Sequence, residues 1–192
     1  MRRYRRLAAV ATALSVAGCT PSPAPREVTP TPAPTVSKPP APASLDVSKY
    51  EEAAFSAPNG NLWCVLYSDG ISCLIPRGYR GAAPKQAEPC PSWNGEDDLR
   101  PNTIDLGPSG KPQWVCLDDQ AARPFKDDPA SGWQRGFGTW RRIDDQLIAV
   151  LPHGKSLRHG VFQCASAASG VTCTNTRTKH GIKLSQQAVT LS

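Results

Sequence analysis

One cysteine pattern occurs twice in this chain. Cys64 and Cys73 are separated by eight residues, and so are Cys164 and Cys173. Each copy has an aromatic residue one or two positions before its first cysteine and ends in Gly-(Ile/Val)-(Ser/Thr)-Cys. Metal sites favour C-x2-C spacings or Cys/His clusters, which the sequence lacks. The repeated pattern therefore predicts two β-hairpins, each closed by a disulfide, in a mostly β domain.

The spacing also predicts the register of each hairpin. Placing the two cysteines of the first copy opposite each other puts Leu66 opposite Ile71 and leaves a loop over 67–70. Glycine is the last loop residue in both copies, where we expect a positive φ. Opposed residues of a non-hydrogen-bonded antiparallel pair lie about 4.5 Å apart at Cα, which is within disulfide range. Closing such a short loop is worth about 2–3 kcal/mol in the chain-entropy model.

The amino terminus predicts export. Four arginines among the first six residues precede the apolar run Leu7–Val16, which is too short to span a bilayer. The small residues before Cys19 resemble the lipobox of bacterial lipoproteins. This resemblance implies a diacylglyceryl group on the Cys19 thiol and cleavage after Gly18, and two or three acyl chains anchor a protein stably. An ordinary secretory signal with an incidental cysteine is the alternative. We expect Sec export, because the twin-arginine motif is incomplete.

Lipidation of Cys19 accounts for the odd cysteine. It leaves six of the seven cysteines, and the two hairpins use four of them. Cys90 and Cys116 are then expected to pair, so that no thiol is free for catalysis or metal binding. We expect the protein at the outer face of the cytoplasmic membrane, held there by the lipid on Cys19.

The signal also carries much of the positive charge. Four of the 22 Lys and Arg residues lie in it, which leaves 18 basic residues against 16 acidic ones in the mature chain. Nucleic-acid binding requires a basic stripe and therefore loses its main support.

Composition divides the remaining chain into a tether and one domain. Pro, Ala, Thr and Ser dominate from Thr20 to about Ser44, and this stretch has too few large apolar side chains to form a core. We assign residues 1–18 to the signal peptide, 19–50 to the lipidated cysteine and tether, and 51–192 to a single domain. An extended polyproline II tether would reach roughly 75 Å from the membrane. A disordered linker is the alternative.

Short runs of strand-forming residues fill the domain, and no long helical stripe occurs in it. One helical turn is expected at 118–123. Strands are expected at 61–67, 71–75, 103–106, 113–117, 139–143, 146–151, 160–165, 170–174 and 180–184. The pattern predicts an all-β fold, a small disulfide-stapled antiparallel sandwich or barrel-like domain. We expect the two repeated hairpins to pair or stack with approximate symmetry.

The segment 55–64 reads F-S-A-P-N-G-N-L-W-C and is followed by D-G-I-S-C at 69–73. These motifs resemble the opening of an actinobacterial family of unknown function, in which F-x-S-P-S/N-G-N-I-x-C leads to G-V-R-C. Residues 151–181 resemble its closing signature, and the similarity covers most of 53–185. It implies a secreted protein or lipoprotein with a Pro-rich tether, and it implies no catalytic residue. Residues 121–146 look like an insertion, and K-H-G-I at 179–182 departs from the family's G-H-G-F.

Motifs for catalysis are weak in this sequence. Gly-Lys-Ser at 154–156 follows an apolar run like a P-loop, but Ala149 occupies the position of the first glycine. Acidic doublets match no Ca²⁺ loop and are typical of solvated turns. Three histidines and several serines are present without a G-x-S-x-G elbow. We predict no catalytic residue, no metal ligand and no cofactor.

A glycine-rich segment combines aromatic and basic residues. The candidate binding residues are Trp133, Phe137, Trp140, Arg141 and Arg142. An exposed aromatic surface stacks on sugar rings, and arginines bind anionic groups. The alternative is that the tryptophans cap the core and the arginines are solvated. We expect a non-catalytic binding or scaffold domain of the cell envelope, whose partner is a cell-wall glycan or an envelope protein. A hydrolase acting on wall polymer or ester is the alternative function.

Overall fold

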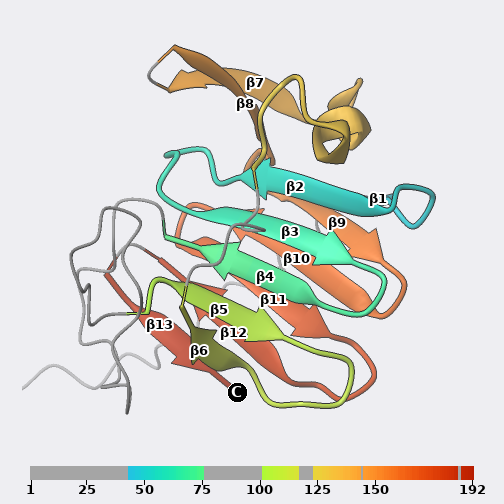
Figure 1. Cartoon of the computed structure of the whole chain (residues 1–192), viewed down its shortest axis with the longest axis vertical. Helices are drawn as coiled ribbons and strands as arrows, with labels where there is room; N and C mark the ends of the chain where they lie inside the picture. Colours follow the sequence, from blue (N-terminus) through green and yellow to red (C-terminus); the bar gives the residue numbers. More distant parts are fainter. Residues whose placement is uncertain (1–42, 76–100, 117–122, 144, 186) are drawn as a thin grey trace, which may run out of the picture. The chain divides into compact units, whose positions relative to one another are not determined.

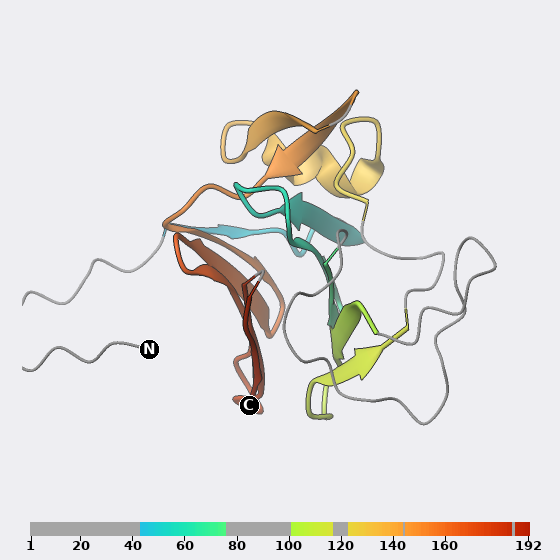
Figure 2. The same cartoon turned by 90° about the vertical axis from the view of Figure 1, so that its left-hand side faces the viewer.

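The computed structural model describes residues 43–75, 101–116, 123–143, 145–185 and 187–192, all of which belong to the compact unit Pro39–Ser192. Two β-sheets face each other (Figures 1 and 2). The seven-stranded sheet has the order β6 (Gln113–Val115), β5 (Thr103–Leu106), β4 (Ile71–Leu74), β3 (Trp63–Tyr67), β2 (Glu52–Ser56), β8 (Gln146–Val150) and β7 (Thr139–Ile143). The six-stranded sheet has the order β1 (Ala43–Asp46), β9 (Lys155–His159), β10 (Phe162–Ala167), β11 (Gly170–Asn175), β12 (Gly181–Leu184) and β13 (Val189–Leu191).

This architecture confirms the expected all-β, disulfide-stapled sandwich. The two sheets keep separate edges and do not close into a barrel. Each sheet is mixed rather than purely antiparallel, because β1 pairs with β9 and β2 pairs with β8 in parallel. Side chains alternate across each strand, so every second residue enters the core between the sheets. On β10, for example, Phe162 and Cys164 are fully buried.

Both hairpin disulfides form as predicted. Cys64 bonds Cys73 and Cys164 bonds Cys173, with Cα–Cα distances of 4.1 and 4.0 Å. The first pairing places Leu66 opposite Ile71, which is the expected register. In the part of the chain that the structure describes, Cys116 is also disulfide-bonded. Its expected partner, Cys90, lies outside the described residues.

The expectation of a positive φ holds for one of the two loop glycines. Gly170 has φ +126°, and a Cβ there would lie 2.0 Å from the carbonyl oxygen of Leu184. Gly70 does not have a positive φ, so the prediction is wrong at that position. Its constraint is a close approach instead, because a Cβ on Gly70 would lie 3.2 Å from the carbonyl oxygen of Leu106.

The two disulfides touch each other in the core. The Sγ atoms of Cys73 and Cys173 are 3.9 Å apart, although the two residues belong to opposite sheets. Neither sulfur carries a hydrogen or a free thiolate, so this is a packing contact. The cluster formed with Cys64 is therefore not a metal site.

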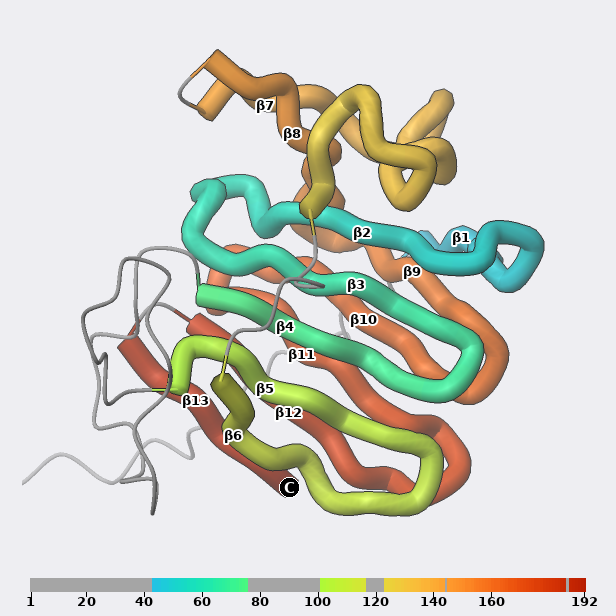
Figure 3. The backbone as a smooth tube through the Cα atoms, viewed as in Figure 1, coloured from blue at the N-terminus to red at the C-terminus, as the bar shows by residue number. Residues whose placement is uncertain are grey.

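The chain builds each sheet around the same five-stranded meander. Strands β2 to β6 form one antiparallel meander and β9 to β13 form the other (Figure 3). Corresponding residues occupy the same register: Phe55 and Leu157 lie opposite the first cysteines of their copies. Ile104 and Ile182 lie opposite the second cysteines. The cysteine repeat of the sequence thus belongs to a larger structural repeat.

The strand before each meander crosses to the other sheet. β1 precedes the first meander but pairs in parallel with β9, and β8 precedes the second but pairs in parallel with β2. The backbone hydrogen bonds made just after β1 and just after β8 also correspond. Val47 N donates to Arg158 O over 2.8 Å, and Leu151 N donates to Ser56 O over 3.0 Å. The two copies therefore exchange their leading strands.

β1 lies within the segment assigned to the tether, so the folded unit begins before residue 51. An exposed ion pair between Asp46 and Arg158 joins β1 to β9. Hydrogen bonds from Ser48, together with Arg158, lower the pKa of the Asp46 carboxyl. Composition could not reveal β1, because its four residues are held by pairing with a distant strand and not by a hydrophobic pattern of their own.

The remaining expected strands are present within a few residues of their predicted bounds. Sequence patterns missed β1, β2, β9 and β13.

The expected turn at 118–123 lies almost entirely outside the described residues. The structure has instead a 3₁₀ helix, η1 (Pro129–Gln134), whose amino end is capped by the Asp128 carboxylate accepting from Ala130 N over 2.9 Å. Burial, with the nearby charge of Asp128, raises the pKa of Glu52 on β2.

We expect the two disulfides to stabilise the fold in a coupled way. Replacing Cys64 and Cys73 with alanine should lower the free energy of unfolding by about 2–3 kcal/mol, and replacing Cys164 and Cys173 should cost a similar amount. Because the disulfides touch, the loss in the quadruple variant should differ from the sum by about 0.5 kcal/mol or more. Urea unfolding of the parent and the three variants measures this difference. Additive losses would show that the sulfur contact carries no energy of its own.

Candidate functional site

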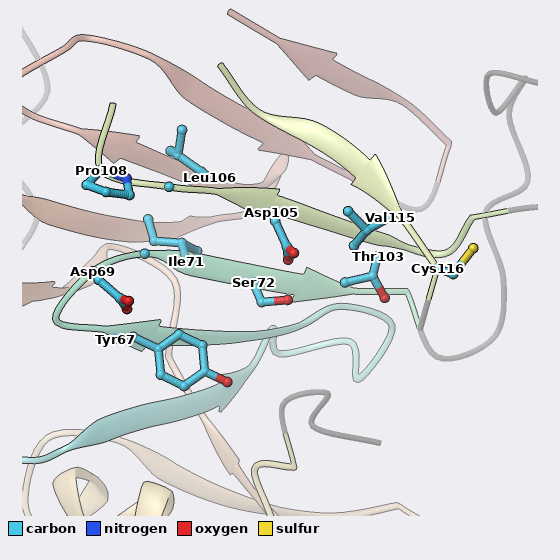
Figure 4. Close-up of a pocket in the computed structure, with 12 residues that line it drawn as sticks. Tyr67, Asp69, Ile71, Ser72, Thr103, Asp105, Leu106, Pro108, Val115 and Cys116 are labelled. Carbon is cyan, nitrogen blue, oxygen red and sulfur yellow. The ribbon is translucent and has the colours of Figure 1, made fainter. Parts of the chain in front are cut away.

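A pocket of about 470 Å³ opens on the seven-stranded sheet at the end that carries β3 to β6 (Figure 4). The residues that line it fall into a polar set and an apolar set. The polar side chains are Tyr67, Asp69, Ser72, Thr103 and Asp105, and Pro108 and Val115 add apolar side chains. The other lining residues are Gly70, Gly107, Cys116, and Ile71 and Leu106, whose side chains are buried in the core. The described lining contains two carboxylates and no basic side chain.

Strand pairing positions the polar side chains of the pocket. Ser72 on β4 lies opposite Asp105 on β5, and Asp105 lies opposite Gln113 on β6. Directly opposed residues of neighbouring strands point to the same face, so these three side chains form a row on the outer face. Thr103 lies two residues before Asp105 on the same face and is buried.

The walls of the pocket are held from two sides. In the β3–β4 loop, Tyr67 N donates to Gly70 O over 2.9 Å, which places Asp69 at the rim. In the β5–β6 loop, Pro108 O accepts two hydrogen bonds, one from the end of β11 in the opposite sheet and one from the turn that follows β11. Asn175 Nδ2 donates to it over 3.1 Å and Arg177 Nη2 over 3.0 Å. Since Asn175 is fully buried, the rim at Pro108 is fixed to the core.

The chemistry of the lining suits a ligand rich in hydroxyl or amino groups. Ionised carboxylates accept hydrogen bonds, and serine, threonine and tyrosine hydroxyls both donate and accept. The ring of Tyr67 adds an apolar face of the kind on which sugar rings stack. Repulsion from the two carboxylates disfavours phosphate or carboxylate groups at this place.

The pocket lies where the two copies of the repeat differ. By register, Tyr67 corresponds to Ala167 and Asp105 corresponds to Lys183. Asp69 corresponds to Ser169. The inward positions stay apolar in both copies, whereas these outward positions change in size and charge. Sequence reasoning missed the pocket, and the signal that could have found it is this difference between the Tyr-Ser-Asp-Gly and Ala-Ala-Ser-Gly loops.

The predicted aromatic surface is divided by the fold. Trp133, in η1, is only 1% exposed, and its Nε1 donates to Ala54 O over 2.7 Å. A Cβ on Gly138 would lie 2.8 Å from the Trp133 ring, so the chain closes tightly over the indole. The expectation that Trp133 contributes to an exposed stacking surface is therefore wrong. The apolar ring and its single donor both find partners inside the domain.

The other candidate binding residues lie nearer the surface. Phe137 is half-buried against the core, and Lys155 Nζ lies 4.7 Å from its ring centroid and donates to its carbonyl oxygen over 2.6 Å. Trp140 is 37% exposed, and Arg141 and Arg142 on the same strand are exposed. These residues do not line the pocket.

The histidines do not assemble a catalytic group. His159 is buried, and its Nε2 is 2.9 Å from Tyr50 O. Nδ1 of His180 is 3.2 Å from the main-chain oxygen of Ser192, and His153 is exposed. Among the described residues that line the pocket there is no histidine. The Gly-Lys-Ser segment enters strand β9 and not a helix, so its geometry is not that of a P-loop.

Among the described residues, no helix is long and apolar enough to cross a membrane. Cys19 lies outside them, and its lipidation stays a prediction. Comparison with protein-family models, curated proteins and solved structures found no match to this chain. The resemblance to the actinobacterial family also stays a prediction.

The two tryptophans allow a direct test of their assigned surroundings. Trp133→Phe should lower the free energy of unfolding by about 1–3 kcal/mol, because the buried carbonyl of Ala54 loses its donor. Trp140→Phe is the matched control and should change it by less than about 0.5 kcal/mol. Urea unfolding compares the two variants. Equal losses would contradict the assignment of Trp133 to the core and Trp140 to the surface.

Proposed function

We propose that this protein is a lipid-anchored domain of the cell envelope that binds a hydroxyl-rich ligand, a segment of cell-wall glycan, in the pocket on β3 to β6. The observation that carries the proposal is the lining, in which two carboxylates and three hydroxyl-bearing side chains converge beside the apolar side chains of Pro108 and Val115. Ligand sites typically combine an apolar surface with a few placed polar groups. The function is binding without catalysis.

Two further observations support the location and the role. Disulfides persist in oxidising compartments, and this small domain contains two that are buried in its core. The polar lining of the pocket lies on the outer face of the seven-stranded sheet, and a site on a sheet face suits a long polymer passing across it. The tether and the lipid on Cys19 would hold such a domain between the membrane and the wall.

A second function deserves a test because the same lining contains Asp69 and Asp105. Glycosidases use a pair of carboxyl groups that flank the scissile bond, one as acid and the other as base or nucleophile. The hydrolase hypothesis therefore uses the same pocket as the binding hypothesis, and the two differ in what happens to the bound ligand. It predicts new reducing ends, whereas the binding hypothesis predicts an intact ligand.

Binding should depend on the carboxylate of Asp105. With neutral chito-oligosaccharides as the probe, Asp105→Asn should weaken binding at least about 10-fold, because a hydrogen bond to a charged group is worth about 1.5–3 kcal/mol. Lys183→Ala changes the corresponding position of the other copy and should leave affinity unchanged. Calorimetric titration measures both, with thermal unfolding to confirm that each variant is folded.

Three outcomes decide between the hypotheses. Binding of intact chito-oligosaccharides that is lost in Asp105→Asn supports the proposal. Chito-oligosaccharides shortened by the parent and not by Asp105→Asn, as seen by mass spectrometry, would replace it with the hydrolase. If the chito-oligosaccharides do not bind, the glycan ligand is wrong.

The anchor has its own test. Cys19→Ser removes the thiol that the lipid would occupy, so the full chain should move from the membrane fraction to the soluble exported fraction or stay as an uncleaved precursor. Immunoblotting of fractions detects the shift. Unchanged membrane association of a correctly cleaved Cys19→Ser chain would refute lipidation.

A further inference from the structure

β7 is an unusual edge strand. The other sheet edges are formed by β1, β6 and β13, which have four, three and three residues, whereas β7 has five. Four of its five residues are exposed, so both of its faces meet solvent. Among the residues that the structure describes, no strand of the other copy corresponds to β7, which extends the seven-stranded sheet beyond the shared pattern (Figure 1). Proteins usually keep exposed edges short, because an edge strand can pair with another chain.

The hydrogen bonds of β8 show which backbone groups of β7 face outward. Lys126 N donates to Leu147 O, and Ala149 N donates to Pro124 O, so Leu147 and Ala149 turn their backbone groups away from β7. Successive residues of an antiparallel strand direct their backbone N–H and C=O groups to opposite sides of the strand. Gln146, Ile148 and Val150 therefore form their backbone hydrogen bonds with β7. Their partners are Ile143, Arg141 and Thr139.

Trp140 and Arg142 therefore direct their N–H and C=O groups to the free edge. In the part of the chain that the structure describes, no hydrogen bond is made by these outward groups. The side chains of Trp140 and Arg142 share one face of β7, because they are two residues apart. Arg141 points to the other face, where its guanidinium donates to Pro58 O.

We propose that β7 pairs antiparallel with β7 of a second copy of this chain, on a two-fold axis through Arg141. In this register Trp140 lies opposite Arg142 of the second copy, and Arg142 lies opposite its Trp140. These are the residues with outward backbone groups, so each pair closes two hydrogen bonds. The edge is thus self-complementary, as a two-fold interface requires.

The side chains agree with this register. Each Trp140 meets an Arg142 on the same face, where the positive guanidinium is attracted to the face of the indole ring. The opposed Arg141 residues repel each other, but the bond from Arg141 to Pro58 O draws each guanidinium toward its own chain. The sheet of the dimer would continue across the axis.

The interface is small. A single added strand buries less than the roughly 1,000 Å² that is typical of a stable interface, so the dimer is weak when the protein is dilute. Confinement of many copies to one membrane surface would raise their effective concentration. The inference is independent of the glycan site, because β7 does not line the pocket.

Site-specific cross-linking of the full chain tests the register. Two residues 141 would face each other in a non-hydrogen-bonded pair, about 4.5 Å apart at Cα, which is the geometry that both native hairpin disulfides use. Arg141→Cys should therefore give a disulfide-linked dimer on a non-reducing gel after mild oxidation of washed membranes or of detergent-solubilised protein. Trp140→Cys and Arg142→Cys are matched controls, because each faces a different residue across the axis. They should cross-link at least about 5-fold less.

A proline blocks the pairing without disturbing the fold. The N–H of Arg142 points outward, so Arg142→Pro removes a donor at the free edge and spares the bonds to β8. Adding Arg142→Pro to Arg141→Cys should abolish the cross-linked dimer, while thermal unfolding stays close to that of the parent. Equal cross-linking at 140, 141 and 142 would indicate random collision and overturn the proposal. A monomeric Arg141→Cys protein at high membrane density, or a cross-link to another protein, would also overturn it.

Discussion

The contact between the two disulfides is the interaction around which the domain is built. Each disulfide closes a hairpin by a local bond, and the 3.9 Å approach of Cys73 and Cys173 sulfurs joins the two hairpins across the core. The residues opposite the cysteines, Phe55 and Leu157 on one side and Ile104 and Ile182 on the other, surround this centre and are almost fully buried. A disulfide is polarisable and carries no polar hydrogen, so these disulfides act as core side chains as well as cross-links. Two short-range constraints thereby define the relative placement of two sheets.

Exchange of the leading strands adds a second link between the copies. Because β1 completes the sheet of the second meander and β8 that of the first, neither copy forms its full sheet alone. Inward positions are restricted by this packing, since a change in volume there leaves a cavity or strain. Outward positions are free of that restriction. The two features with the strongest claim to function, the pocket on β3 to β6 and the free edge of β7, both lie outward and both break the symmetry of the repeat.

The sequence marks the segment from Trp133 to Arg142 as aromatic and basic, but composition does not reveal which face a side chain occupies. Trp133 lies in a short 3₁₀ helix that covers β2, and its indole N–H donates to Ala54 O, whereas Trp140 is exposed. Asp69 and Asp105 give no local signal, because they are 36 positions apart in the chain and single acidic residues are common. Only the pairing of β4 with β5 brings Ser72 and Asp105 together and places them beside the loop that carries Asp69.

The hairpins, their register, the disulfide pairing of four cysteines and the all-β class can all be predicted from the amino-acid sequence. These properties depend on residues within ten positions of one another, where spacing translates directly into geometry. Only the folded chain shows that the hairpins meet sulfur to sulfur, that β1 and β8 exchange sheets, that β2, β9 and β13 exist as strands, and that a pocket forms on β3 to β6. These features depend on pairing between segments far apart in the chain. Such pairing is selected by burial of the whole core and leaves little trace in the local composition of either segment.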